Sequence, residues 1–212
     1  MCDNPAVLAG MMRVLVVGLV VLVAAMFLIP RGDRGALRAA TLLPEPRTLP
    51  DVALVDSQGQ PLHLKDLHGQ FTLLFFGFTN CPDVCPLTLK ALADARAELA
   101  RRAPRIVPPR VVFVSIDPRR DSAARIAAYV ARFDASFIGA TAPDRVLEPL
   151  LAALDVTVEK HAHDDAPYNV THSATVYVLN PDAEWIAVAK GPHDPVIVAT
   201  DYLKIRQRRP AA

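Results

Sequence analysis

The sequence predicts an α/β fold in which helices flank a mixed β-sheet, with a single transmembrane helix in front of it. Three observations support this prediction. Apolar runs with strand character alternate with segments of helical spacing through most of the chain. A closing pair of strands and a last helix follow, which is the element order of a layered α/β domain. An uninterrupted apolar run, residues 14–29, precedes the whole domain.

Residues 1–30 are predicted to form an N-terminal membrane anchor. The apolar run 14–29 is just shorter than the roughly 17–25 residues that a spanning helix needs, and apolar character continues upstream of Arg13. A cleaved secretory signal is the competing interpretation, which the short run favours and the lack of a clear cleavage site disfavours. Because most nearby arginines follow the run, the positive-inside rule opposes an exported domain. We nevertheless expect export, because the function inferred below requires it.

Composition sets the predicted boundaries of the folded domain. Residues 31–48 are rich in proline, arginine and alanine and lack periodicity, which predicts a linker. The folded domain is expected over residues 49–207, and residues 208–212 are expected to form a tail.

Each element within the domain is predicted from its pattern. Residues 52–64 indicate an N-terminal β-hairpin extension with a glycine-containing turn, and the apolar runs 71–78 and 110–117 indicate two buried strands. Helices are predicted over residues 86–101, 121–133, 143–154 and 194–206, with Asp121 or Ser122 capping the second and Asp194 the last. We also expect a short strand at 137–139, brief pairing at 156–158, a polar loop at 161–169, and a closing strand pair at 173–179 and 185–189. Thioredoxin-like folds have this order.

Cys81 and Cys85 stand where the strand 71–78 gives way to the helix 86–101. Cys85 is expected at or near the helix N-terminus, where partial positive charge lowers a thiol pKa. Residues four apart in a helical turn lie about 6 Å from each other, so the pair permits either a disulfide or convergence on one metal ion. We expect an exposed, activated pair; a plain disulfide or two buried cysteines are the alternatives. The chain has three cysteines, and the remaining one, Cys2, is interpreted as inert.

His172 is the best placed of the six histidines to supply a third donor. It stands at the entry of the strand 173–179, which is expected beside 71–78 with its start facing the cysteine turn. Two thiolates and an imidazole suit Cu(I) and can also hold Cu(II), whereas zinc prefers a fourth ligand that we do not find. Asp83 either orients the loop or favours the helix dipole. His63 and His68 are interpreted as surface residues and His193 as a residue with a local structural role. His161 and His163 are interpreted as loop residues, with a transient metal-loading patch as the alternative.

These residues resemble the Sco/SenC family of copper-binding proteins over about residues 50–205. The stretch 76–86, Phe-Gly-Phe-Thr-Asn-Cys-Pro-Asp-Val-Cys-Pro, looks like the family's cysteine signature. The stretch 115–121, Ser-Ile-Asp-Pro-Arg-Arg-Asp, and the stretch 170–173, Val-Thr-His-Ser, are similar to two further family blocks, as are Tyr129, Phe133 and residues 137–139. The resemblance implies that Cys81, Cys85 and His172 bind copper. Thr171 stands where the family usually has aspartate, so copper affinity or redox behaviour is expected to differ.

The resemblance further implies a copper chaperone, not an enzyme, that delivers copper to the copper A site of a cytochrome c oxidase during assembly. A thiol–disulfide oxidoreductase that reduces the oxidase cysteines before copper insertion is the alternative, and a peroxidase-like thiol enzyme is a weaker third. The expected partners are the copper A-bearing oxidase subunit, a periplasmic copper donor and, through the N-terminal helix, the membrane. A formal net charge of +1 gives no indication of nucleic-acid binding. The short segment before the anchor favours a bacterial inner-membrane protein, single-pass, with its domain in the periplasm.

Overall fold

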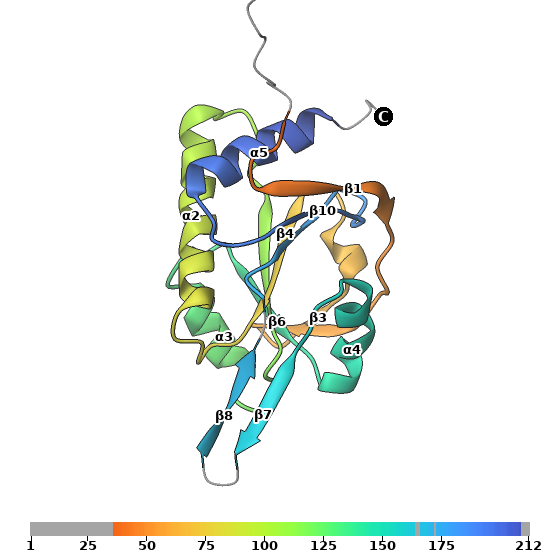
Figure 1. The fold of residues 1–212 in the computed structure, drawn as a ribbon, viewed down its shortest axis with the longest axis vertical. Coiled ribbons are helices and arrows are strands. Elements are labelled where there is room, and N and C mark those ends of the chain that lie inside the picture. Colours follow the sequence, from red (N-terminus) through yellow and green to blue (C-terminus); the bar gives the residue numbers. More distant parts are fainter. Residues whose placement is uncertain (1–35, 164–165, 172, 209–212) are drawn as a thin grey trace, which may run out of the picture. The chain divides into compact units, whose positions relative to one another are not determined.

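The computed structural model describes residues 36–163, 166–171 and 173–208 (Figure 1). The predicted anchor, residues 1–30, lies outside the described residues, and Leu37 begins the compact unit that holds the elements below. Within these ranges no helix has the length and apolar character needed to cross a membrane.

An eight-stranded mixed sheet organises the domain, with strand order β1-β10-β9-β4-β5-β6-β2-β3. Its strands are β1 (Ala40–Arg47), β2 (Leu54–Asp56), β3 (Pro61–Leu62), β4 (Thr72–Gly77), β5 (Arg110–Ser115), β6 (Ile138–Thr141), β9 (Val176–Leu179) and β10 (Trp185–Ala189). A second sheet pairs β7 (Glu159–His163) with β8 (Ala166–Thr171). The helices are η1 (Leu64–Leu67), α2 (Val84–Arg102), α3 (Ala123–Val130), α4 (Asp144–Ala153) and α5 (Pro195–Gln207).

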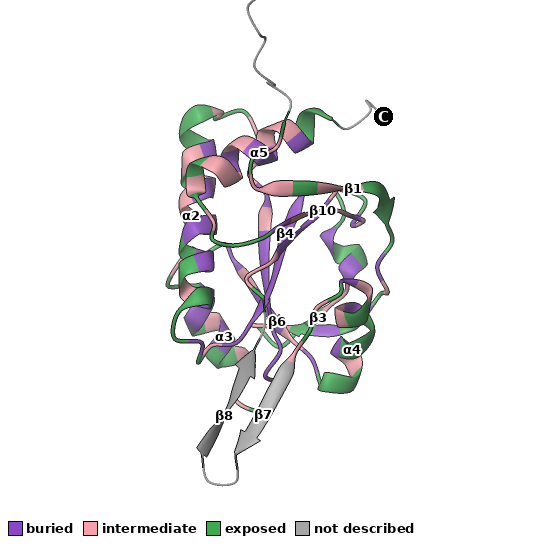
Figure 2. Ribbon diagram, viewed as in Figure 1, coloured by how far each residue is buried: buried purple, intermediate pink, exposed green. Residues whose placement is uncertain are grey.

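The core is centred on β4 and β5, which pair in parallel from Thr72 opposite Arg110 to Gly77 opposite Ser115. Every residue of β4 is buried, as expected for a central strand covered on both faces. Helices α2 and α3 lie on one side of these strands in Figure 1, with η1 and α4 on the other. Figure 2 shows the buried residues gathered on the central strands and on the helix faces turned towards them. The predicted layered α/β architecture is confirmed.

The prediction of a linker over residues 31–48 is wrong for its second half. Residues 40–47 form β1, which pairs antiparallel with β10 at the edge of the sheet. The buried carboxylate of Asp201, on α5, accepts hydrogen bonds of 2.8–3.0 Å from the backbone N–H groups of Arg38, Ala39 and Ala40. The prolines of this stretch are compatible with an edge strand, where half of the N–H groups need no partner. The folded unit therefore begins near Leu37 and not at residue 49.

The remaining element predictions are mostly confirmed. Strands β2 and β3 form the expected hairpin, and Ser122 and Asp194 cap α3 and α5 by accepting hydrogen bonds from backbone N–H groups. The polar loop predicted at 161–169 is wrong, because the chain there forms the β7–β8 hairpin. The charged and histidine residues of β7 conceal its strand signal, whereas β8 alternates apolar Ala166, Tyr168 and Val170 with other residues and could have indicated a strand. Residues 156–158, where brief pairing was expected, lie in no strand.

Candidate metal centre

Both cysteines lie where the sequence predicts them, between the central strand and the first long helix. Strand β4 ends at Gly77 and α2 begins at Val84, so Cys81 belongs to the connecting loop and Cys85 to the first turn of the helix. The backbone N–H of Cys85 donates to Cys81 Sγ at 3.4 Å. Neither cysteine forms a disulfide. The first helical turn thus brings the two sulfur atoms into one small region.

The expectation of an exposed, activated thiol pair is wrong. Cys85 has no solvent exposure and Cys81 is 8% exposed. A hydrogen bond to Cys81, followed by burial, raises the pKa of the Cys85 thiol far above its ordinary value. An apolar, enclosed site disfavours the thiolate. Cys85 is therefore a protonated thiol at neutral pH.

Alkylation tests this protonation state. At pH 7.5 we expect iodoacetamide to modify Cys85 at least about tenfold more slowly in the native copper-depleted protein than in the urea-unfolded chain, because Cys85 is buried and because the thiolate, which a raised pKa disfavours, is the nucleophile. Since the folded pKa is the higher one, the unfolded state ionises first, and the free energy of unfolding should fall as pH rises above about 8.5. Fragment-ion mass spectrometry distinguishes Cys81 from Cys85. Equal rates in the two states would contradict a buried, protonated Cys85, and a free energy of unfolding that does not fall above about pH 8.5 would contradict the raised pKa.

Gly77 makes room for the Cys85 sulfur. A Cβ atom at position 77 would lie 2.7 Å from Cys85 Sγ and 2.8 Å from the Phe113 ring. The Phe113 ring in turn packs against Tyr129 of α3, with ring centroids 5.5 Å apart. Burial, and then the proximity of Cys85 and Cys81, raise the pKa of Tyr129. The cysteine pair therefore occupies a tightly packed site next to the aromatic rings of Phe113 and Tyr129.

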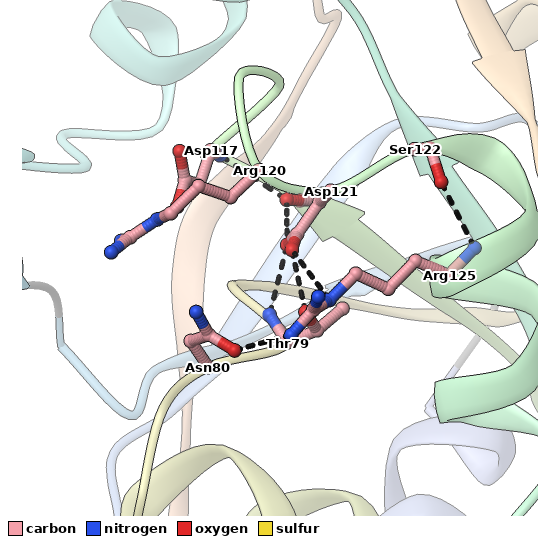
Figure 3. A network of polar contacts seen from close by, with 8 residues as sticks. Thr79, Asn80, Asp117, Arg120, Asp121, Ser122 and Arg125 are labelled. Carbon is pink, nitrogen blue, oxygen red and sulfur yellow. Dashed lines mark hydrogen bonds and ion pairs between the residues drawn. The ribbon is translucent and has the colours of Figure 1, made fainter. Parts of the chain in front are cut away.

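A buried carboxylate fixes the loop that leads into Cys81 (Figure 3). Asp121 accepts hydrogen bonds from the Thr79 N–H at 2.8 Å and from the Thr79 hydroxyl at 2.5 Å. It also accepts one from the Ser115 hydroxyl at 2.6 Å. Arg125 donates to Thr79 Oγ1 at 2.7 Å and to the side-chain oxygen of Asn80. The end of β5 and the start of α3 therefore hold the loop two residues before Cys81.

Sequence reasoning missed this role of Asp121, which it considered as a helix cap and as the last residue of the family-like stretch 115–121. Its partners lie up to 42 residues away along the chain, so no local pattern reveals them. The one available signal is the parallel pairing of β4 with β5, which places Thr79 and Ser115 at the same edge of the sheet.

The strand predicted over residues 173–179 lies beside β4 as expected, but it begins at Val176 and residues 173–175 are in no strand. β9 pairs antiparallel with β4, and Val176 stands opposite Phe75. Residues 173–175 therefore approach the edge of the sheet from which the cysteine loop departs. His172 itself lies outside the described residues, and its role as a ligand stays a prediction. The described residues contain no group of three histidine, cysteine or acidic side chains able to hold a metal ion.

Three of the other polar candidates have local roles. His193 Nε2 is 2.7 Å from the carbonyl oxygen of Ala174, and burial lowers the pKa of its imidazole. His63 lies 3.2 Å from Asp51 in the hairpin region. Asp83 is the exposed N-cap residue of α2, and its side chain makes no capping hydrogen bond.

A mixed sheet with helices on both faces, carrying a cysteine pair at the turn from its central strand into a helix, defines a thioredoxin-like thiol protein. A family model described as SCO1/SenC matches residues 42–206. The chain belongs to the SCO1/SenC family.

Individual relatives agree with this assignment. A Stutzerimonas stutzeri protein named as copper-binding is 33% identical over 153 residues, which cover 71% of this chain and 74% of that protein. The Arabidopsis thaliana mitochondrial protein SCO1 homolog 1 is 32% identical over 158 residues, 74% of this chain and 47% of that protein. The chain thus spans about half the length of the plant relative.

Two solved structures match most of the chain. The crystal structure of Arabidopsis thaliana ScoI with copper bound has a TM-score of 0.69 and 30% identity, and the match covers 74% of this chain and 98% of that one. The solution structure of apo Sco1 from Thermus thermophilus has a TM-score of 0.66 and 32% identity over 82% of this chain and 96% of that one.

Proposed function

We propose that this protein is a copper chaperone that carries copper on Cys81, Cys85 and His172 and delivers it to the copper A site of a cytochrome c oxidase during assembly. The observation that carries the proposal is the adjacent, buried sulfur pair at the β4–α2 loop of a SCO1/SenC domain. The copper held by the Arabidopsis relative's structure supports it.

The donor set fits copper as a cargo. Thiolates are soft ligands that favour Cu(I), and the two sulfur atoms share one small buried region. A ligand thiol must lose its proton, so copper binding releases protons and is stronger at higher pH. Because Cys81 lies in the loop and Cys85 in the helix, ligand exchange with a recipient begins at Cys81, the more exposed of the two.

The proposed setting is the bacterial inner membrane, with the domain in the periplasm. The apolar run of residues 14–29 supports an N-terminal anchor. The proposed partners are the copper A-bearing oxidase subunit and a periplasmic copper donor. This setting would keep the domain close to an oxidase embedded in the same membrane.

Copper stoichiometry tests the proposed ligands. We expect the native protein to bind one copper ion, Cys81→Ala and Cys85→Ala to abolish tight binding, and His172→Ala to weaken it by about tenfold or more, because one of three ligands is lost. His68→Ala, at an exposed position, is the matched control and should bind as the native protein does. Unchanged affinity and spectra for His172→Ala would reject the three-ligand site.

Thiol–disulfide exchange is a second candidate function, favoured by the contact between the two cysteines. The reduced pair would pass two electrons and two protons to a disulfide of the oxidase subunit, and would itself become the Cys81–Cys85 disulfide. This step needs no histidine. His172→Ala should therefore lose copper affinity but keep disulfide exchange if both functions are present, and exchange absent from the native protein would reject the second.

A further inference from the structure

A groove of about 270 Å³ lies beside the loop that carries Cys81. One wall is the loop itself, through Thr79, and the other is the outer face of α3 and the residues just after it. Its lining carries two positive charges and no negative one: Thr79, Arg125, Ala128, Tyr129 and Arg132. None of the proposed copper ligands lines this groove.

The two guanidinium groups of the groove differ in their charge partners. Arg125 is half exposed and forms an ion pair with the buried carboxylate of Asp121 at 3.8 Å, and that carboxylate also accepts three hydrogen bonds. Arg132 stacks over the rings of Tyr129 and Phe133, at 4.9 and 5.8 Å from their centroids. The ion pairs found in the described parts of the chain do not include Arg132. Stacking therefore holds its guanidinium in place and leaves its donors for another group.

Exposed apolar side chains flank the cysteines on the α2 side of the loop. Val84 is 39% exposed and Leu87 is 64% exposed, and both are among the few large apolar residues that face solvent. They stand one and two residues from the buried Cys85. Protein–protein interfaces combine apolar side chains with arginine, which is enriched there relative to the rest of the surface. A small anion would use the arginines and leave the apolar residues uncovered.

We propose that this groove docks an acidic segment of the protein that receives the copper, with carboxylates on Arg125 and Arg132 and apolar side chains on Val84 and Leu87. The identity of the partner as a copper acceptor rests on the proposed function. The guanidinium group binds a carboxylate through two parallel hydrogen bonds, which fixes orientation as well as charge. The groove begins two residues before Cys81, so a segment seated there would bring the recipient's ligands to the metal.

The same geometry links docking to the cysteine loop. Arg125 donates to both Thr79 and Asn80, so a carboxylate bound to Arg125 competes for donors that hold the loop. Docking would thereby loosen the residues leading into Cys81 when the recipient is in place. Among the described residues Arg132 makes no hydrogen bond to the loop. Substituting Arg132 therefore tests peptide docking without disturbing the loop that carries Cys81.

Binding of a labelled peptide to the full chain in neutral detergent tests the proposal. The probe is a synthetic glutamate-rich peptide with leucine at intervals, read by fluorescence anisotropy, with a lysine-for-glutamate peptide as its counterpart. We expect Arg132→Glu to weaken binding of the acidic peptide by about tenfold, because it removes an arginine, a residue enriched among interface hot spots, and places a like charge against the peptide. The matched control is Arg105→Glu, which makes the same charge change at an exposed position beyond the far end of α2 and should leave the affinity within about twofold.

Three outcomes would overturn the proposal. If Arg132→Glu and Arg105→Glu weaken peptide binding equally, the peptide is held by the general positive charge of the protein and not by the groove. Displacement of the peptide by acetate at matched carboxylate concentration would mean a small-anion site. Unchanged binding by Arg132→Gln, the milder variant that guards against misfolding, would exclude Arg132. Copper stoichiometry separates this test from the proposed function, because Arg132→Glu should keep its copper while Cys81→Ser should lose copper and keep the peptide.

Discussion

Replacing Asp121 by alanine is expected to lower the free energy of unfolding by about 3–5 kcal/mol and to weaken copper binding. The change leaves the Thr79 N–H, the Thr79 hydroxyl and the Ser115 hydroxyl without their acceptor in a buried region. Each unsatisfied buried donor costs about 1–3 kcal/mol. The loop before Cys81 also loses the contact that fixes it, so the two sulfurs and any third ligand meet less often in the binding geometry.

A second buried carboxylate provides the matched control. Asp201 likewise accepts hydrogen bonds from three successive N–H groups, but it fixes residues 38–40 at the edge strand β1. We expect Asp201→Ala to destabilise the fold by a similar amount without changing copper affinity. Urea unfolding and competition with a copper chelator measure the two quantities separately. Equal copper affinities for the two variants would show that Asp121 stabilises the fold without positioning the cysteine loop.

Local patterns were sufficient to predict the elements that frame the site. The apolar run of β4, the prolines after each cysteine and the helical spacing of α2 place Cys81 and Cys85 correctly. The apolar run before Leu179 likewise predicts a strand beside β4, which the register of Phe75 with Val176 confirms. These features follow from neighbouring residues, so a single sequence carries them.

The features that sequence reasoning missed depend on contacts between distant residues. Strand β1 is fixed by Asp201, more than 160 positions further along the chain. The raised pKa of Cys85 comes from a sulfur neighbour and from burial under the folded core, whereas the sequence shows only the helix N-terminus. The role of Asp121 needs β5 and α3 to be in place before Thr79 can reach it. Each of these requires the tertiary structure.

Gly77→Ala is expected to disturb the sulfur site more directly than any change outside the ligands. The added methyl group would lie 2.7 Å from Cys85 Sγ and 2.8 Å from the Phe113 ring, distances that force one of them to move. Phe113 and Cys85 are both fully buried, so either one can move only by disturbing the packing around the sulfur site. We expect a loss of about 1–3 kcal/mol in the free energy of unfolding, the usual cost of overpacking a core, together with weaker copper binding.

Gly139→Ala separates overpacking from an effect on the site. Its methyl group would press on Ile126 of α3 and approach Val130, and neither contact involves a cysteine. We expect comparable destabilisation with copper affinity retained, as measured by urea unfolding and by chelator competition. If both variants lose copper equally, the sulfur pair depends on general core packing. If only Gly77→Ala does, the space beside Gly77 is what allows the Cys85 sulfur to meet its metal.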